Sequence, residues 1–540
     1  MSMTRTHPEP CPSCSTATKN LGCEGSCSTA KKHTAGGGYA TLFWLVVFLA
    51  CFILYGATAS RGICWQDSGW NQLRALDGDY SQSVPLARAH VLYIAGGHLL
   101  AKISPEHMPF AFNLLSSVWM AVALANLAVI GAMLTGRRWI GLAVAATLAL
   151  THTTWWLGTI NESYAWVLAG FTAEIYLLIR LLGKPSWKTL AALALVNGLG
   201  LCAHNFALLP LPVYAIVACW LVAKRKIPAW SLAIAAVSYL IGSGVFLGMI
   251  VASAIRNGSV AWALRDALTG QYASSVLNLA SAGRYLKANL AISALNFINP
   301  LAPLAIVGLV KLRARLGGPL AVALTAITAI QVIFFVRYPV PDQFMFILPT
   351  LACLAVLACV GLDVLADLVR PRWRVALACV MLAIALVQPV VYVSAREFAQ
   401  RNGPIRKRQL PFRNEADYWL TPWKHDKNSA EKFARLALQA AAPHGVILAD
   451  NTSIYPLLLA QRLAKNNEFA GVRIYKGPDF LSQANADWPG CNAVVACRAK
   501  LAGRPLFVVH NQPGALPTKL SEGVSLTKTP NSSLYRTAWR

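Results

Sequence analysis

The chain has 540 residues, of which 56% are hydrophobic and 13% charged, and 48 Lys and Arg against 22 Asp and Glu give a formal net charge of +26. This low charged fraction and a mean hydropathy of +0.49 exclude an ordinary soluble domain, in which about a quarter of the residues are charged. Much of the basic excess lies in short clusters between apolar runs, which is typical of a membrane protein and argues against nucleic acid as a partner.

Residues 1–37 form a polar segment that we expect to be a flexible cytoplasmic tail. It contains two close pairs of cysteines, Cys11 with Cys14 and Cys23 with Cys27. Four thiolates can bind zinc, so these cysteines are a candidate metal site. Only eight residues separate the pairs, however, and nothing nearby resembles a fold around a metal. A reduced, flexible tail is therefore the favoured interpretation.

Eleven apolar runs predict an α-helical polytopic membrane domain over residues 38–394, because each run is long enough to approach the thickness of a bilayer. We interpret the first run as an uncleaved anchor, since so long a polar leader is unusual before a signal peptide. The approximate limits of the runs are 39–60, 110–135, 139–157, 163–182, 188–205, 207–223, 228–252, 290–310, 318–336, 343–368 and 374–394.

The basic clusters test this count, because short cytoplasmic loops are enriched in Lys and Arg. All of the basic clusters face the cytoplasm only if the moderately apolar stretch 85–103 does not cross the membrane. That stretch contains Arg88, His90, His98 and Lys102 and is better explained as a helix at the membrane interface. The alternative is twelve spans with the amino terminus outside. The clusters are Lys31-Lys32, Arg137-Arg138, Lys184 with Lys188, Lys224-Arg225-Lys226, Lys311 with Arg313 and Arg315, and Arg370 with Arg372 and Arg374.

With eleven spans, the loop 61–109 and residues 395–540 are extracytoplasmic and the protein lies in the cell (inner) membrane. The composition after residue 394 is that of a soluble domain, and short apolar runs flank a helix-like segment. This alternation predicts a small α/β domain. Cys491 and Cys497 could pair there in an oxidising compartment, although spacing alone does not establish a disulfide. The segments are Gly445–Asp450, Tyr455–Lys465, Ala493–Cys497 and Pro505–His510.

The predicted topology brings several polar groups to the external side of the membrane. Each has an ordinary explanation alone: Glu162 and Asp342 can begin or cap a helix, and His204 can pack in a core. Ionisable groups at the membrane edge are rare and usually functional, so their joint placement with Asp67 favours a site. Asp67 lies in the first external loop, directly after the first span.

These groups suit a transfer from a phosphate-linked lipid to a hydroxyl group. A carboxylate can accept the proton of an attacking hydroxyl, which makes Asp67 the candidate general base. External arginines, of which Arg284 and Arg337 are the candidates, can bind a phosphate leaving group through their planar donors. A transporter or lipid-carrier flippase is the main alternative, but such proteins usually place their sites near the midplane, often within repeats. No repeat is visible here.

Four motifs occur in an order that resembles the multi-pass GT-C glycosyltransferases. The branch they are most similar to contains the animal protein O-mannosyltransferase that modifies plexin-type receptor domains, with uncharacterised bacterial relatives. The motifs are Trp65-Gln-Asp67-Ser-Gly69, Trp155 seven residues before Glu162-Ser-Tyr164, Gly198-Leu-Gly-Leu-Cys-Ala-His204-Asn205, and Tyr338-Pro-Val-Pro-Asp342-Gln-Phe344. The segments Arg408-Gln-Leu-Pro411-Phe-Arg413 and Ala449-Asp450 near Tyr455-Pro456 resemble the segment after the membrane part in those relatives.

The resemblance implies a GT-C fold, a polyprenyl-phosphate sugar donor, a protein or glycan acceptor, and inversion at the anomeric carbon. It gives Asp67 the catalytic role. Glu162 and Tyr164 match a Glu-Val-Tyr motif of the family, and His204 with Asn205 matches a pair of histidines. We therefore expect Glu162, Tyr164, His204, Asn205, Asp342, Arg284 and Arg337 to bind substrate. The resemblance leaves open a divalent metal at the active site.

The sequence departs from the family pattern at two places. Trp70 stands where the family commonly has a glutamate after Asp-Ser-Gly. The expected Pro-Pro-Gly turn is replaced by Pro85-Leu-Ala-Arg88-Ala-His90. The first departure motivates a third alternative, a scaffold of the same fold that has lost catalysis.

Overall fold

The computed structural model describes residues 37–276, 285–338, 340, 342–403, 409–487, 501, 503–511, 516–517, 524–530 and 532–539. Several sequence predictions fall outside these ranges, and they remain predictions. They concern Cys11, Cys14, Cys23, Cys27, Arg284, Arg408, Cys491 and Cys497.

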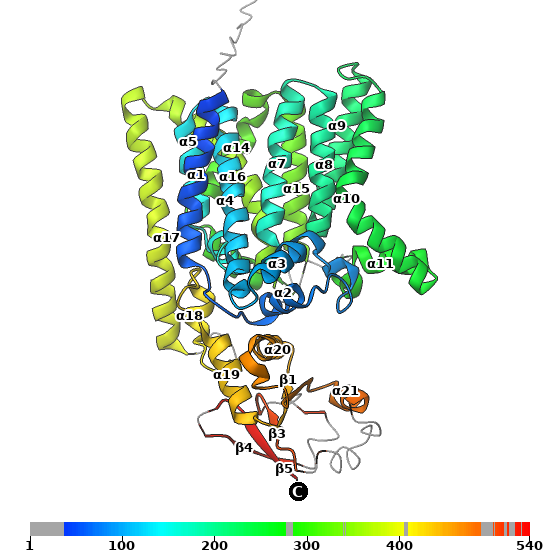
Figure 1. Ribbon diagram of the computed structural model, residues 1–540. Helices are drawn as coiled ribbons and strands as arrows, with labels where there is room; N and C mark the ends of the chain where they lie inside the picture. The colour runs from blue at the N-terminus through cyan, green and yellow to red at the C-terminus, as the bar shows by residue number, and fades with distance from the viewer. Residues whose placement is uncertain are drawn as a thin grey trace, which may run out of the picture.

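The described chain is a helical bundle with a small α/β domain at one end (Figure 1). Eight described helices are long and apolar enough to cross a membrane, and a bent pair of helices makes nine. Two shorter helices run beside them. Helix α5 packs against α4 and α17, and helix α8 packs against α7 and α10. The chain is thus a multi-pass membrane protein, and these helices account for the eleven predicted runs.

The helices of the bundle begin and end as follows: α1 (Gly37–Thr58), α4 (Met108–Thr135), α5 (Arg138–Ala149), α7 (Tyr164–Gly183), α8 (Trp187–Ala203), η2 (Asn205–Leu208), α9 (Leu211–Ala223), α10 (Trp230–Asn257), α13 (Leu286–Asn296), α14 (Leu301–Leu316), α15 (Gly318–Arg337), η5 (Gln343–Ile347), α16 (Leu348–Leu368), η6 (Pro371–Trp373) and α17 (Arg374–Asn402).

Helix α16 is the centre of the bundle, and almost all of its side chains are buried. It is rich in alanine, cysteine and glycine, which allow close approach between helices where lipid supplies no hydrophobic driving force. Its tightest contact is with α14, because Gly308 and Gly361 face each other and a Cβ on either would overlap a backbone carbonyl of the other helix. The peripheral helices α1, α10 and α17 instead expose leucine, valine and isoleucine, as expected for surfaces that face lipid.

Two predicted spans are interrupted, so these predictions were wrong in detail. The run at 139–157 is divided into α5 and a short helix α6 (His152–Leu157). The run at 290–310 is bent by 97° between α13 and α14. Pro300 lacks an amide hydrogen, and the Asn299 side chain accepts the amide of Leu301 and donates to Gln388. Apolar composition did not reveal the bend at Pro300, because the Asn299 side chain bonds the backbone of that turn.

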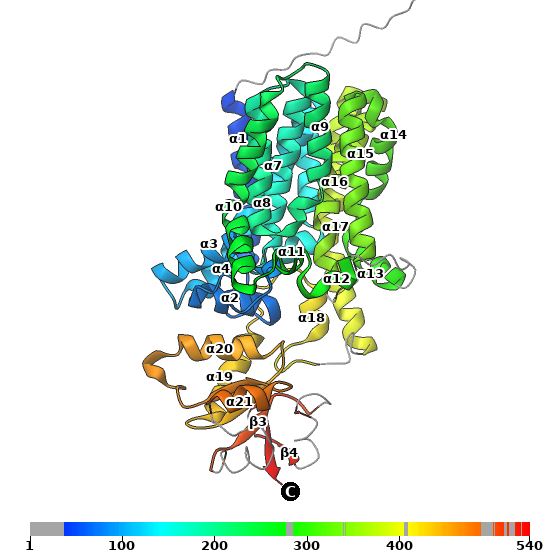
Figure 2. The same cartoon turned by 90° about the vertical axis from the view of Figure 1, so that its right-hand side faces the viewer.

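The elements between spans collect at the end of the bundle that faces the small domain (Figures 1 and 2). Helix α3 lies across this end of the bundle and not along the spanning helices, in agreement with the interface helix predicted for 85–103. The elements are α2 (Gln66–Asp77), η1 (Leu86–Arg88), α3 (Val91–Ile103), α6, α11 (Val260–Leu268), η3 (Gly270–Tyr272) and α12 (Ala273–Val276).

The C-terminal part contains a mixed five-stranded sheet of order β2-β1-β3-β5-β4. Strand β1 pairs in parallel with β2 and β3, and β5 pairs antiparallel with β3 and β4. The predicted α/β domain is therefore present. Its elements are α18 (Glu415–Leu420), α19 (Ser429–Ala441), β1 (Val446–Ala449), α20 (Ile454–Leu463), η7 (Lys465–Asn467), β2 (Arg473–Lys476), α21 (Phe480–Asp487), β3 (Leu506–Val508), β4 (Val524–Lys528) and β5 (Tyr535–Trp539).

The two faces of this sheet pack in different cores. Ile447 and Ala449 of β1 belong to a large core that includes α19 and α20 and continues into the bundle. Val446 and Leu448 point to a separate core around Phe480 of α21. This alternation follows from the strand period of two residues. The small domain is therefore joined to the membrane part through one face of its sheet.

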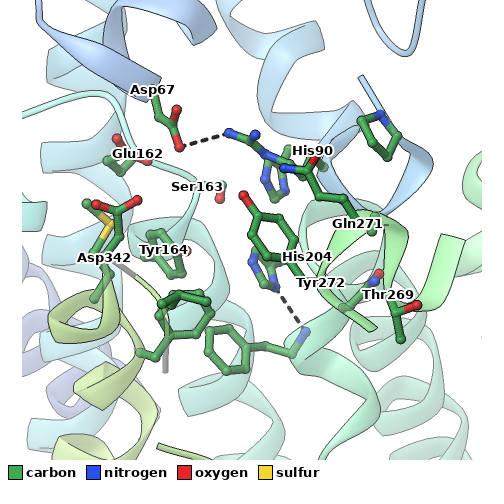
Figure 3. Close-up of a pocket in the computed structure, with 18 of the residues that line it drawn as sticks. Asp67, His90, Glu162, Ser163, Tyr164, His204, Thr269, Gln271, Tyr272 and Asp342 are labelled. Carbon is green, nitrogen blue, oxygen red and sulfur yellow. Dashed lines mark hydrogen bonds and ion pairs between the residues drawn. The ribbon is translucent and has the colours of Figure 1, made fainter. Parts of the chain in front are cut away.

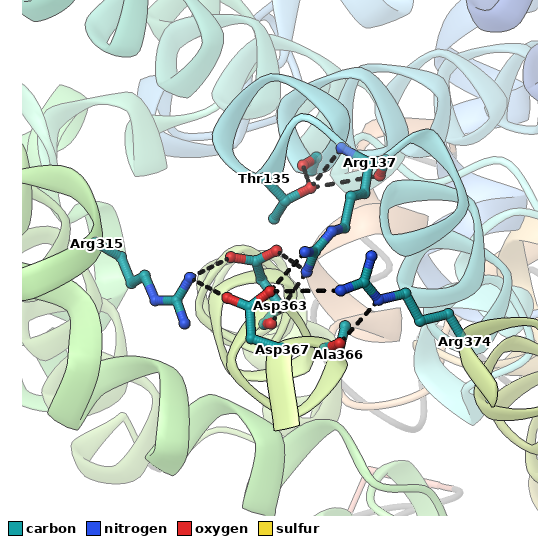
Figure 4. A network of polar contacts seen from close by, with 8 residues as sticks. Thr135, Arg137, Arg315, Asp363, Ala366, Asp367 and Arg374 are labelled. Atoms are coloured by element: carbon teal, nitrogen blue, oxygen red, sulfur yellow. Dashed lines mark hydrogen bonds and ion pairs between the residues drawn. The ribbon is translucent and has the colours of Figure 1, made fainter. Parts of the chain in front are cut away.

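Of the six basic clusters predicted to face the cytoplasm, Lys31-Lys32 lies outside the described residues. The other five lie in or next to the connections α4–α5, α7–α8, α9–α10, α14–α15 and α16–α17, at the end of the bundle away from the small domain (Figures 1 and 2). Three of these arginines form a network with two carboxylates of α16 (Figure 4). Arg137 and Arg315 both contact Asp363 and Asp367, and Arg374 approaches Asp367. The network ties the α4–α5 connection, α14 and α17 to the end of α16.

We predict that Gly361→Ala lowers the unfolding temperature in detergent, because the added methyl overlaps the Leu304 carbonyl oxygen and such overpacking costs about 1–3 kcal/mol. Gly244→Ala on α10 is the matched control, since a Cβ there meets no atom within 4 Å. Equal unfolding temperatures of the two variants would contradict the close α14–α16 crossing.

Candidate functional site

A cavity of about 690 Å³ lies where the bundle meets the small domain. Three parts of the chain line it: α2 with the loop after it, the bundle end, and the small domain. Figure 3 shows labelled residues of the first two parts. Asp67, Trp70, Arg74 and Arg88 come from the first part. The polar lining from the bundle end is Glu162, Ser163, Tyr164, His204, Asn205, Thr269, Gln271, Tyr272, Tyr338 and Asp342, and the small domain contributes Asn451, Tyr455 and Lys476.

The structure brings together most of the residues predicted to form a site. Asp67, Glu162, Tyr164, His204, Asn205 and Asp342 all line the one cavity, although they come from separate segments of the chain. Arg337 does not line it. This arginine borders an adjoining hollow of about 260 Å³, whose other lining residues are Leu209, Val276, Ile330, Ile333, Phe334 and Tyr338.

Asp67 is held at the first turn of α2 by an unusual local conformation. The preceding residue, Gln66, has a backbone φ of +55°, a value that residues other than glycine rarely adopt. Gly69 makes the turn possible, because a Cβ there would overlap the Cys64 carbonyl oxygen. The side chain of Ser68 points to the bundle and donates to Glu162 Oε1 at 2.6 Å. The Gln-Asp-Ser-Gly segment is thus a strained turn that directs Asp67 into the cavity.

Asp67 pairs with Arg88, whose Nη2 lies 2.8 Å from Oδ2 of the carboxylate. The Asp67 side chain is 45% exposed and that of Arg88 22%. Burial alone lowers the pKa of the Arg88 guanidinium, but the charge and hydrogen bond of Asp67 raise it above its usual value. The same guanidinium lies 4.6 Å from the ring centre of Trp70, a cation–π contact.

Arg74 organises the loop that carries Arg88. Its side chain is buried and donates to four backbone carbonyls, those of Asp79, Tyr80, Arg88 and Ala89. Burial lowers the pKa of this guanidinium to about 10, so it remains charged at neutral pH. A buried arginine that satisfies four carbonyls fixes the loop as one piece.

Glu162 differs from Asp67 in its environment. It is buried, and its side chain accepts a hydrogen bond from Ser68. The Ser116 hydroxyl accepts the Glu162 backbone amide and donates to the Glu162 carbonyl. Burial raises the pKa of the Glu162 carboxyl to about 8, and the nearby charges of Asp67 and Asp342 add to this effect. Glu162 is therefore mostly protonated at neutral pH, when it can donate as well as accept a hydrogen bond.

Two histidines form part of the cavity wall. The rings of His90 and His204 stack at 5.0 Å with an angle of 16° between them. His90 Nδ1 donates to the Ala203 carbonyl at 2.9 Å, and the Phe206 amide donates to His204 Nδ1 at 3.1 Å, which requires that nitrogen to be unprotonated. Burial, together with His204 and Arg74, lowers the pKa of His90 well below its usual value. The histidine pair is thus an uncharged, hydrogen-bonding surface.

Sequence patterns do not identify several of the residues that line the cavity. Arg88 stands out only as one basic residue of an interface helix, and no pattern singles out Arg74 or Lys476, which lies at the end of β2. Trp70 is visible only as a departure from a family pattern. Its partner is Tyr455 of the small domain, 5.0 Å away and nearly parallel. These contacts join residues far apart in the chain, which periodicity does not reveal.

Comparisons with known proteins identify the fold. No family model matches the sequence, and no curated protein matches it. The crystal structure of ArnT from Cupriavidus metallidurans bound to undecaprenyl phosphate aligns with a TM-score of 0.54 at 14% identity, over 93% of this chain and 98% of that one. Its apo state aligns with a TM-score of 0.54 at 13% identity, over 92% and 98%. The chain has the GT-C fold.

The GT-C fold was expected from the motifs in this sequence, and the whole-length alignment confirms it. The finer resemblance to protein O-mannosyltransferases stays a prediction. Within the described part of the chain, no three His, Cys, Asp or Glu side chains converge as a metal site would require, and the seven cysteines described are not in disulfides.

The raised pKa of Glu162 predicts how stability depends on pH. The folded protein keeps a proton on Glu162 up to about pH 8, while the unfolded chain releases it near pH 4.5. Stability from this group therefore falls as pH rises between these two values. We expect Glu162→Gln to remove this fall. The unfolding temperature of the variant, relative to that of the wild type, should therefore increase from pH 5 to pH 8. Parallel curves in a thermal-unfolding series would contradict a protonated Glu162.

Proposed function

We propose that the protein is an integral-membrane glycosyltransferase, which transfers a sugar from a polyprenyl-phosphate donor to a hydroxyl group of a protein or glycan. Asp67 is the general base. The observation that carries this proposal is the pairing of a partly exposed carboxylate with a guanidinium in a cavity at the end of a GT-C bundle. A base and a phosphate-binding group side by side are what this transfer needs.

The reaction follows from these two groups. The acceptor oxygen attacks the anomeric carbon and its proton passes to the Asp67 carboxylate. The bond between that carbon and the donor phosphate oxygen breaks, and the electron pair remains on the phosphate. Attack from the face opposite the leaving group inverts the anomeric centre. Arg88 binds the phosphate as its negative charge grows, a task that suits a planar guanidinium.

The donor lipid has a suitable place beside the cavity. The smaller hollow is lined mainly by apolar side chains, three of them from α15, with Arg337 also on its border. It shares Leu209, Val276, Phe334 and Tyr338 with the main cavity. An isoprenoid tail placed in this hollow brings its phosphate to the main cavity. The undecaprenyl phosphate bound to ArnT supports a lipid of this class.

Glu162, Tyr164, His204, Asn205 and Asp342 then form the sugar pocket. Protonated Glu162 can donate to a sugar oxygen, and the uncharged histidines and tyrosine offer hydrogen bonds without repelling the phosphate. The resemblance of the motifs to protein O-mannosyltransferases makes mannose the first sugar to test.

The basic clusters orient the protein in the cell (inner) membrane. They lie at the end of the bundle opposite the cavity, so we place that end and the amino terminus in the cytoplasm. The cavity and the small domain are then extracytoplasmic, where neither nucleotide sugars nor other cytoplasmic donors occur. A lipid-linked donor fits this location.

Asp67→Asn should abolish transfer of a labelled sugar from its polyprenyl phosphate, with a loss of about 10²–10⁴-fold in turnover because the amide cannot accept the proton. The matched control is Asp77→Asn, which changes an exposed carboxylate at the other end of α2. Full activity of Asp67→Asn would eliminate the proposed base. Flux of the lipid across proteoliposomes without a covalent product would favour a flippase.

Arg88→Ala should raise the KM for the donor and lower turnover, while Arg88→Lys keeps a positive charge and part of the activity. Arg265→Ala on the exposed face of α11 is the control for loss of a cation near the membrane surface. Steady-state kinetics with varied donor separates the two parameters. An unchanged donor KM in Arg88→Ala would place the phosphate elsewhere.

A further inference from the structure

We propose that the small C-terminal domain positions the catalytic segment, by holding the residues on either side of Asp67. This inference rests on the proposed function for its kinetic consequence, but not for its geometry. The sequence leaves open whether this domain recognises the acceptor or only supports the membrane part. Its contacts around Asp67 assign it a part in building the active site.

The residue two positions before Asp67 is anchored in the small domain. The Trp65 indole Nε1 donates to Ser429 Oγ at 2.9 Å, and its ring stacks on Phe433 of α19 at 5.2 Å. The indole is 3% exposed, and the guanidinium of Arg413 lies 5.7 Å from the ring centre. Trp65 is therefore a core residue of the small domain, although its backbone belongs to the membrane part.

The residues next to Asp67 are held by α20 and the turn before it. The Gln66 amide donates to the Thr452 carbonyl at 3.3 Å. Three residues after Asp67, the Trp70 ring stacks on Tyr455 at 5.0 Å with 9° between the rings. The domain thus contacts the backbone before Asp67 and the side chain one helical turn after it.

The membrane part holds the same segment from the other side. Ser68 donates to Glu162, and Asn161 Nδ2 donates to the Ser68 carbonyl at 2.7 Å. Gln72 accepts the Cys64 amide and donates to the Pro109 carbonyl. Since residues on both sides of Asp67 are fixed by different parts of the protein, the position of its carboxylate depends on both.

The small domain is itself fixed to the bundle, so it can act as a rigid support. The Lys424 amide donates to the Thr58 carbonyl at 2.8 Å, and the Thr159 hydroxyl donates to the Pro422 carbonyl at 3.0 Å. A domain that only captured an acceptor would not need to bury Trp65 or to stack on Trp70. This support gives the aromatic residue at position 70 a structural role, at the position where the resembled family pattern has a glutamate.

The test compares two matched substitutions of buried phenylalanines in the small domain. Phe433→Leu removes the ring beneath Trp65, whereas Phe480→Leu changes the separate core on the other side of the sheet. Tyr455→Leu and Tyr455→Phe form a second pair, since only the second keeps a ring against Trp70. The full-length protein in detergent is used throughout.

Hydrogen–deuterium exchange of the backbone amides of residues 65–71 is the first readout. We expect Phe433→Leu and Tyr455→Leu to raise the exchange rate several-fold, and Tyr455→Phe and Phe480→Leu to leave it near the wild-type value. Unchanged exchange in the first two variants overturns the proposal. So does an equal rise in Phe480→Leu, since the effect would then reflect general loosening of the domain.

Kinetics give the second readout. Displacement of a catalytic group lowers turnover roughly 10- to 100-fold, with the KM for the donor little changed, whereas loss of an acceptor site would raise the acceptor KM instead. A raised acceptor KM at unchanged kcat overturns the positioning role. If the wild type transfers no sugar but the exchange pattern holds, the proposed function fails and the positioning of this segment stands.

Discussion

Helix α2 is held between the membrane bundle and the small domain, and the placement of the paired charges in the cavity depends on this. Its first turn is fixed by Glu162 and Asn161 on one side and by Ser429, Thr452 and Tyr455 on the other. Its later part carries Arg74, which fixes the loop bearing Arg88. Asp67 and Arg88 meet because one short helix organises both of them.

Two of the carboxylates that line the cavity, Asp67 and Glu162, have different environments. Asp67 is partly exposed and paired with the Arg88 guanidinium, and in the proposed reaction it is the base. Glu162 is buried behind it, with a carboxyl pKa raised to about 8. Enzymes commonly separate the tasks of two acidic residues by such differences in burial and charge. The sequence contains both residues but does not show this difference.

Much of the fold could be predicted because its signals are local. Apolar runs gave the helices of the bundle, and the bias of Lys and Arg placed α3 at the edge. The bend at Pro300 was missed, since the Asn299 side chain bonds the backbone there and the run is apolar on both sides. The break between α5 and α6 falls at the short polar stretch 151–154, which the prediction of a single span included. For the site, topology brought Asp67, Glu162, His204 and Asp342 to one side. Arg88 and Tyr455 were missed because their partners lie 21 and 385 residues away in sequence.

The most direct measurement of the central claim is a structure of the protein bound to a polyprenyl phosphate. The account predicts that the phosphate lies within hydrogen-bond distance of Arg88, that the isoprenoid tail occupies the hollow beside α15, and that Asp67 faces the space above the phosphate. A phosphate bound away from Arg88, with the tail on another face of the bundle, would contradict it.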